Sequence, residues 1–191
     1  MRIISGKYKN KLIIGHDVLG TRPTMSKIRE ALMSLIFEYL KDSVFLDLFA
    51  GSGIIAFEAL SNGAKKIILN DMNYKCIKNI KLNKANLNLT DDECVIEYKF
   101  YDKFLQKFKE KVDIIYLDPP YDKDETEEIK YIIENKILND NSLIVYETDN
   151  QKYIDNIRKL EEKGIIEILK IKKYGRPNII YITGRWERWR F

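Results

Sequence analysis

The sequence predicts an α/β protein built on a doubly wound, mostly parallel β-sheet. Three observations lead to this prediction. From residue 42 onward, short apolar runs alternate with longer stretches whose apolar residues recur at helical spacing. A glycine-containing turn follows the first of these runs, and an acid-proline-proline sequence ends the fourth. Regular alternation of strands and helices is typical of a parallel sheet with helices on both faces.

Composition limits the class of protein. The 191 residues are 45 % hydrophobic and 32 % charged, which is typical of a soluble domain of ordinary size. No apolar run approaches the ~20 residues of a membrane helix, and the first residues lack the apolar centre of a signal peptide, so we expect a cytoplasmic protein. Cys76 and Cys94 are too few for a disulfide framework and are expected in the core. The single histidine, His16, argues against a His-based zinc site or a Ser-His-Asp triad, and we expect no metal.

Residues 1–41 are expected to form an N-terminal extension. Alternating apolar residues over 1–14 predict two short strands joined in a hairpin. Apolar residues at helical spacing predict a helix over 26–40. On this helix, Arg29 and Glu30 are expected to serve a structural ion pair rather than to contact a substrate.

Residues 42–191 are expected to form the main domain. Each predicted strand is followed by a helix, except that a GRPN turn joins the last two strands and makes them antiparallel. The predicted strands cover 44–50, 65–71, 94–99, 112–118, 142–148, 165–174 and 179–186. The predicted helices cover 54–63, 73–86, 103–110, 124–135 and 150–163.

Positive charge is concentrated at the two ends of the chain. Residues 1–41 carry eight Lys/Arg against three acids, a net +5, and residues 173–191 carry five against one, a net +4. The middle carries twenty against twenty-five, a net −5. This asymmetry favours a polyanionic partner held by the ends, although lysine-rich ends are also compatible with a merely solvated surface.

A turn of small residues, 50–53, follows the first strand. Glycines there allow a ligand to approach the backbone closely, and the free N–H groups at the start of the next helix favour a negative group. Asp71 ends the second strand about 20 residues downstream, where an acid reaches the two hydroxyls of a ribose. A ribose-containing ligand is therefore expected at this edge of the sheet, although such a turn also occurs as a tight structural turn.

The stretch from Asp47 to Gly53 resembles the first motif of the S-adenosylmethionine-dependent methyltransferases, an acid-x-F-x-G-x-G turn on a Rossmann-like sheet. The resemblance implies S-adenosylmethionine as the cofactor, Asp71 as the ribose ligand and Met72 beside the adenine. The adenine amino group is expected near Phe100 to Asp102, with the backbone of Tyr101 as its partner. The residues implied to line the methionine and the ribose are Asp47, Phe49, Ala50, Gly51, Ser52 and Gly53.

The fourth strand ends in the catalytic candidates Asp118, Pro119, Pro120 and Tyr121. In a doubly wound sheet this strand lies beside the first, so that these residues would face the glycine turn across one cleft. An exocyclic amino group is a weak nucleophile because its lone pair is delocalised into the ring. Asp118 and a carbonyl of the rigid proline pair would accept its two hydrogens and free the lone pair, while Tyr121 offers a face on which an extruded base stacks. The stretch resembles the Asp/Asn/Ser-Pro-Pro-aromatic motif of methyltransferases that act on amino groups of nucleic acid bases or of protein glutamine.

The front end of the chain narrows the resemblance. Stretches 1–13, 21–36, 59–73 and 116–122 resemble, in order, the RsmD family of bacterial small-subunit ribosomal RNA guanine methyltransferases. The resemblance implies methyl transfer to the 2-amino group of one guanine in the small-subunit (16S) ribosomal RNA, in free RNA or in an assembling particle. It also implies roles for residues outside the two motifs: binding at the cofactor cleft by Arg22 and Thr24, and phosphate contacts by Arg2, Lys7, Lys9 and Lys11.

Other functions and roles stay open on the sequence alone. A DNA adenine methyltransferase would need a target-recognition domain, for which 191 residues leave no room. A glutamine methyltransferase would more typically carry Asn at position 118, and a non-catalytic RNA-binding protein would be expected to have lost the glycine turn or Asp118. Tyr8 is expected to stack on RNA or to cover the sheet edge, and the tail with Trp186 and Trp189 to contact RNA or to cap the last strand. We expect a monomer without membrane contact.

Overall fold

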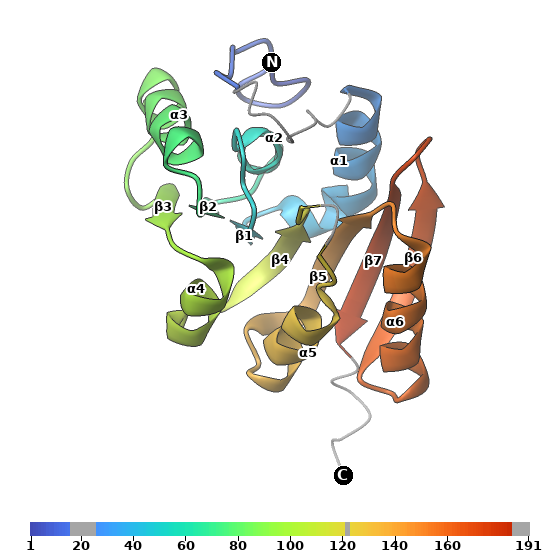
Figure 1. Ribbon diagram of the computed structural model, residues 1–191. Helices are drawn as coiled ribbons and strands as arrows, with labels where there is room; N and C mark the ends of the chain where they lie inside the picture. The colour runs from blue at the N-terminus through green and yellow to red at the C-terminus, as the bar shows by residue number, and fades with distance from the viewer. Residues whose placement is uncertain (16–25, 121–122, 185–191) are drawn as a thin grey trace.

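A seven-stranded sheet lies at the centre of the computed structural model, which describes residues 1–15, 26–120 and 123–184 (Figure 1). The strand order is β3-β2-β1-β4-β5-β7-β6. The strands are β1 (Val44–Asp47), β2 (Lys66–Asp71), β3 (Cys94–Tyr98), β4 (Val112–Leu117), β5 (Leu138–Thr148), β6 (Ile166–Lys173) and β7 (Asn178–Gly184). The pairs among β1 to β5 are parallel, whereas β7 runs antiparallel to both β5 and β6. The predicted doubly wound sheet with an antiparallel last hairpin is confirmed.

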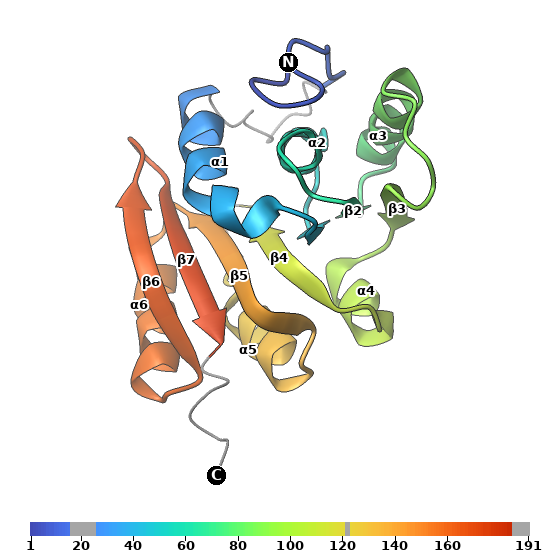
Figure 2. The ribbon, with the colours of Figure 1, turned by 180° about the vertical axis from the view of Figure 1, so that it is seen from behind.

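Within the described residues, three helices cover each face of the sheet (Figures 1 and 2). Those on one face are α1 (Ser26–Leu40), α2 (Ile54–Ser61) and α3 (Tyr74–Asn86), and those on the other are α4 (Tyr101–Lys107), α5 (Thr126–Glu134) and α6 (Gln151–Glu162). No helix in the described ranges is long and apolar enough to cross a membrane. Because both faces are covered, the central strands are apolar at nearly every position.

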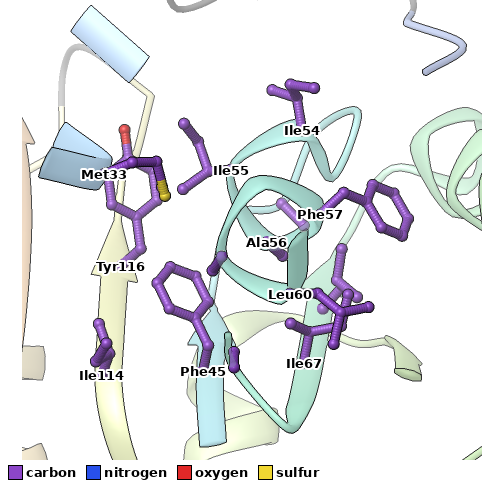
Figure 3. Packing of buried hydrophobic residues seen from close by; sticks show 14 of the residues in the cluster. Met33, Phe45, Ile54, Ile55, Ala56, Phe57, Leu60, Ile67, Ile114 and Tyr116 are labelled. Atoms are coloured by element: carbon purple, nitrogen blue, oxygen red, sulfur yellow. The ribbon is translucent and has the colours of Figure 1, made fainter. Parts of the chain in front are cut away.

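The core explains how the first and fourth strands come together. Phe45 on β1, Ile67 on β2 and Ile114 on β4 pack under the apolar residues of α2 (Figure 3). Fully burying one such side chain stabilises the fold by roughly 2 kcal/mol. Since β1 pairs with β4, the sheet order reverses between them, as predicted, and their carboxyl ends lie side by side. Cys76 and Cys94 are buried, also as predicted.

The predicted N-terminal hairpin is present, as two short arms that pair antiparallel. Residues 1–15 contain an antiparallel bridge between Arg2 and Leu12, and the N–H groups of Ile3 and Ile13 donate to the carbonyls of Lys11 at 3.0 Å and Met1 at 2.7 Å. Their backbone groups bond to α2: the N–H of Ile4 donates to Glu58 at 3.0 and 3.1 Å, and the N–H of Tyr8 donates to the Ser61 hydroxyl at 2.9 Å. These contacts anchor the hairpin on α2, while other backbone donors pair its two arms.

The extension and the sheet share apolar packing. Ile3, Ile13 and Leu32 lie in the same buried cluster as Phe45 of β1, and Tyr8 packs partly buried against it. Because one buried cluster includes residues from both parts, the division of the chain into an extension and a main domain at residue 41 remains a prediction. The ion pair of Arg29 is made with Glu58, at 3.5 Å, with both side chains buried, whereas Glu30 is exposed.

Element ends differ from the predictions where a turn or a register shift intervenes. β1 ends at Asp47 and not at 50, because residues 48–50 already belong to the turn that follows. β5 begins at Leu138 and not at 142, since Leu138 pairs with Val112 across an irregularity in the ladder. α4 spans Tyr101–Lys107 instead of 103–110.

Candidate active site

The turn after β1 requires glycine at two positions for different reasons. Gly53 has φ +78°, and a Cβ added there would lie 2.8 Å from side-chain atoms of Leu69 and Phe57. Gly51 has φ +54°, but nothing lies within 4 Å of the place where its Cβ would be. Gly53 thus serves packing and the turn, whereas the open space over Gly51 leaves its backbone accessible to a ligand. Ala50 accepts a hydrogen bond from the N–H of Gly53 at 2.7 Å, and the N–H of Ile54 donates to the Ser52 hydroxyl at 3.3 Å.

Asp71 ties the end of β2 to this turn. Its Oδ2 accepts a hydrogen bond from the N–H of Gly51 at 2.7 Å, and its Oδ1 accepts from the N–H of Asn73 at 2.7 Å. Burial raises its pKa from the usual value, while these backbone hydrogen bonds lower it. The predicted ribose ligand is therefore a fixed, partly buried carboxylate at the edge of the turn. Each of its oxygens retains a lone pair for a hydroxyl donor.

Asp47 is a buried acid, and one of its carboxylate oxygens has no hydrogen-bond partner. It is 1 % exposed, and its Oδ1 has no hydrogen-bond partner. Burial, followed by the charge of Asp71, raises its pKa to about 8, although a hydrogen bond from the backbone of Phe49 lowers it. No ion pair reaches Asp47, Asp118 or Glu147 from residues 1–15, 26–120 or 123–184. An acid in this state favours a ligand that carries positive charge.

Aromatic side chains flank the turn on the side of α4. The rings of Phe49 and Tyr101 have centroids 5.5 Å apart, and Lys123 Nζ lies 3.1 Å from the Tyr101 centroid. The ammonium group also bonds to Glu125, which is fully buried, at 2.6 Å. Tyr101 is the first residue of α4, so its backbone N–H lies in the unpaired first turn, where a ring nitrogen of an adenine would find a donor. Met72 and Phe100 are exposed at the ends of β2 and β3.

Asp118 has an acidic neighbour that the sequence interpretation missed. Leu117 of β4 pairs with Tyr146 of β5, so the next residues, Asp118 and Glu147, stand side by side on parallel strands and point to one face. The hydroxyl of Tyr116 donates to Glu147 Oε2 at 2.7 Å. Both acids line a narrow crevice, together with Pro119, Pro120, Lys123, Thr148, Asp149 and Pro177.

The surroundings of Asp118 and Glu147 favour the neutral, protonated form of both side chains. Burial raises the pKa of Asp118 well above its usual range, and the charges of Glu147 and Asp47 raise it further. Burial also raises the pKa of Glu147, although the hydrogen bond from Tyr116 lowers it. In the register, Asp47 of β1 pairs with Tyr116 of β4, so all three acids lie on one face of neighbouring strands. A positive ligand at this edge would lower all three pKa values.

The basic residues predicted to bind RNA lie apart from this crevice, on the N-terminal segment. Arg2, Lys7, Lys9 and Lys11 are all exposed. The segment is anchored because its backbone bonds to Glu58 and Ser61, and a Cβ at Gly6 would lie 1.9 Å from the carbonyl oxygen of Ser61. Arg22, Thr24 and Tyr121, as well as His16, Trp186 and Trp189, lie outside the described residues. The assigned roles of all the predicted site residues remain predictions.

Two further residues, Lys123 and Glu147, line the candidate site, and the sequence carried a signal for Glu147. Glu147 is an acid that directly follows the run LIVY (143–146) in a strand covered on both faces, where acids are rarely buried without a partner. Lys123, which stacks on Tyr101, had no comparable signal because its contact depends on how the chain turns after β4. Among the described residues, no group of three His, Cys, Asp or Glu side chains is arranged to hold a metal ion.

Comparisons with known proteins give a consistent family. The family model described as Conserved hypothetical protein 95 matches residues 1–183. Ribosomal RNA small subunit methyltransferase D of Haemophilus influenzae is 31 % identical over 174 residues, covering 87 % of this chain and 90 % of that protein. The protein of the same name from Buchnera aphidicola subsp. Acyrthosiphon pisum is 34 % identical over 154 residues, covering 80 % of each.

A solved structure agrees with these relatives. The Escherichia coli protein yhhF, described as a candidate methyltransferase, superposes with a TM-score of 0.81 at 25 % identity, covering 96 % of this chain and 97 % of that one. The fold of the described residues is thus the Rossmann-like fold of methyltransferases. The chain belongs to the RsmD family, whose named members are ribosomal RNA small subunit methyltransferases.

Proposed function

We propose that the protein transfers a methyl group from S-adenosylmethionine to the exocyclic 2-amino group of a guanine in small-subunit ribosomal RNA. The observation that carries the proposal is the pair of neighbouring acids, Asp118 and Glu147, at the carboxyl ends of β4 and β5, beside the open glycine turn after β1. Membership of the RsmD family supports ribosomal RNA as the substrate. Such a substrate would make the protein cytoplasmic.

The residues around the turn fit the cofactor. S-adenosylmethionine supplies a methyl group on a positively charged sulfonium, and it also carries an ammonium group, a carboxylate and a ribose. Asp47, buried with an unpartnered oxygen, suits the positive end of such a ligand. Asp71 would hold the ribose hydroxyls, and the open backbone of Gly51 would accept the ligand closely. Met72 and the backbone of Tyr101 would flank the adenine.

Asp118 and the proline pair would activate the amino group. The ionised Asp118 accepts one N–H of the amine, which draws the nitrogen lone pair out of the ring and directs it at the methyl carbon. The second acceptor would be a carbonyl of the proline pair, that of the buried Pro119 or that of Pro120, which also accepts the N–H of Lys123 at 3.0 Å. The prolines fix these groups in place before the substrate arrives.

Glu147 gives a reason to prefer guanine over adenine. The Watson–Crick edge of guanine presents two adjacent donors, N1–H and the 2-amino group, whereas adenine presents one donor beside the unprotonated N1, an acceptor. Two neighbouring carboxylates match two donors. A carboxylate facing the N1 of adenine would be repelled, and such a buried mismatch discriminates strongly. Because Tyr116 occupies only Oε2 of Glu147, Oε1 is the acceptor for N1–H.

A methyl-transfer assay tests the proposal. The purified chain is incubated with S-adenosylmethionine that carries a labelled methyl group, together with undermethylated small-subunit particles, naked ribosomal RNA or duplex DNA. The expected product is N2-methylguanosine in the RNA or the particles. Label that appears only in DNA adenine, or no label in any nucleic acid despite cofactor binding, would overturn the proposal.

Two variants test the assigned roles. Asp118→Ala is expected to abolish turnover while cofactor binding, measured by calorimetry, is largely kept; turnover that survives would refute its role. Glu147→Gln is expected to weaken the preference for guanine over adenine in short RNA substrates by at least tenfold, because an amide can also donate to the adenine N1. The matched control is Glu127→Gln, which removes a charge on α5, away from the crevice. An unchanged preference in Glu147→Gln would remove Glu147 from the specificity argument.

A further inference from the structure

Helix α3 is the most positively charged helix of the described fold. Its thirteen residues, YKCIKNIKLNKAN, include Lys75, Lys78, Lys81 and Lys84 and no acid. By contrast α6, of similar length, carries Lys152, Arg158 and Lys159 against three acids, and α5 carries one lysine against three acids. A helix on the surface of a soluble protein normally mixes both signs. The composition of α3 therefore indicates a partner that is itself negative.

Three of these lysines lie on one exposed face. Lys75, Lys78 and Lys81 are exposed, and at 100° per residue they fall within an arc of about 120°. The fourth, Lys84, is turned away from that face, where it pairs with Asp91 at 2.5 Å and donates to the carbonyl of Cys94 at 2.6 Å. The acidic charge that follows α3 is thus partly neutralised by Lys84, and the exposed stripe stays positive.

Exposed aromatic rings stand at the N-terminal end of the same face. Tyr74, the first residue of α3, is 64 % exposed, and Tyr98, the last residue of β3, is 58 % exposed. Their ring centroids are 6.0 Å apart at an interplanar angle of 66°. Neither ring is needed to fill the core, since neither belongs to the buried clusters. Flat rings beside a line of cations are the combination with which proteins hold single-stranded nucleic acid.

Helix α3 contacts both the cofactor turn and the basic N-terminal segment. At its start, the N–H of Asn73 donates to Asp71 of the cofactor turn. Near its end, the buried Asn83 accepts from the N–H of Ile14 at 2.8 Å and donates to the carbonyl of Ile14 at 3.0 Å, which fixes the lysine-rich N-terminal segment against the helix (Figure 1). Residues 1–15 carry Arg2, Lys7, Lys9 and Lys11 and no acid. Two basic elements, the N-terminal segment and α3, are thus joined by hydrogen bonds, and the start of α3 is joined to the cofactor turn.

We propose that the α3 face, defined as Tyr74, Lys75, Lys78, Lys81 and Tyr98, binds the RNA that flanks the target base. The lysines contact consecutive phosphates, and the tyrosine pair stacks an unpaired base close to the cofactor turn. The inference rests on the proposed function, because it takes the substrate to be RNA. The α3 face would be a second RNA-binding surface besides the N-terminal segment, and it would lead the RNA strand toward the cleft.

Binding measured against salt concentration separates the two parts of the face. The full chain is titrated onto a fluorescently labelled, unmodified transcript of small-subunit ribosomal RNA, and onto a labelled single-stranded RNA of mixed sequence. Removing three phosphate contacts in Lys75→Ala/Lys78→Ala/Lys81→Ala is expected to reduce the slope of log affinity against log salt by about 2, which corresponds to roughly 100-fold weaker binding at about 0.1 M salt. Tyr74→Ala/Tyr98→Ala is expected to weaken binding roughly tenfold with the slope unchanged.

The control removes the same charge elsewhere. Lys152→Ala/Lys159→Ala/Lys163→Ala, on α6 and its C-terminal cap, lowers the net charge equally but lies on the opposite face of the sheet, and it is expected to change affinity less than twofold. Wild-type affinity and slope in the α3 variants, or an equal loss in the α6 control, would overturn the inference. Normal RNA binding combined with lost methylation of assembled particles would also overturn it, and would assign the face to a ribosomal protein.

A methyl-transfer measurement keeps the two proposals apart. If the wild type methylates guanine in RNA and the α3 variants bind RNA normally, only the inference about α3 fails. If the wild type methylates no RNA at all, the proposed function fails whatever the α3 variants do.

Discussion

Replacing Asp47 with Asn is expected to stabilise the ligand-free protein, and increasingly so as the pH rises. Burial at 1 % exposure raises the pKa of Asp47 from 3.8 to about 8. Between these two values the unfolded chain has released a proton that the folded protein keeps, so each pH unit lowers the free energy of unfolding by about 1.4 kcal/mol. From about pH 5.5 to about pH 8 this single carboxyl removes about 3 kcal/mol of stability, allowing for its partial ionisation at the upper end. An asparagine has no proton to lose, so in the variant this loss disappears.

Urea denaturation across that pH interval measures the difference. The free energy of unfolding of the wild type and of Asp47→Asn should diverge by about 3 kcal/mol, with an unchanged dependence on urea concentration. Asp92→Asn, which alters an exposed acid, should follow the wild type. Parallel curves for the wild type and Asp47→Asn would refute the reasoning, because they would mean that Asp47 is already ionised in the folded protein at about pH 5.5. The same variant should bind S-adenosylmethionine more weakly, since it lacks the negative charge.

Three further outcomes follow from named contacts. Gly53→Ala is expected to lower the free energy of unfolding by about 2–4 kcal/mol, because φ is +78° and the new Cβ meets Leu69 and Phe57, whereas Gly51→Ala, with open space, should cost only about 1 kcal/mol; equal denaturant midpoints would contradict this. Arg29→Met should lower the free energy of unfolding by about 3–5 kcal/mol, because it leaves Glu58 buried without its ion-pair partner. Adding Glu58→Gln should recover part of this loss. No recovery in thermal denaturation would show that packing, and not charge, dominates. In a pH profile of methyl transfer, Glu147→Gln should move the acid limb to lower pH, because the charge of Glu147 raises the pKa of Asp118; an unmoved limb would mean that Asp118 does not set it.

The sequence predicted the features that depend on neighbours along the chain. The apolar runs, the turn around Gly51 and the stop at Pro119 are local patterns, so the strands, the glycine turn and the position of Asp118 could be inferred and then placed by the rule that the sheet order reverses between β1 and β4. The hairpin of the front segment could be predicted in the same way, but its attachment to Glu58 and Ser61, about 50 residues away, could not. No periodicity within residues 1–14 carries that information.

The features that escaped prediction depend on register between distant strands. Glu147 becomes a neighbour of Asp118 only because Leu117 pairs with Tyr146, and a shift by one residue would turn Glu147 to the opposite face. The same register sets Asp47 opposite Tyr116. The three acids therefore lie on one face through strand pairing alone. Burial raises the pKa of each, so each lowers the stability of the ligand-free protein as the pH rises. A site built in this way gains most from a positively charged ligand, since one charge lowers the cost of all three carboxylates together. Binding of the cofactor would then favour the ionised form of Asp118, which is the form that accepts a hydrogen bond from the amine. Cofactor binding would in this way prepare the site for the amine.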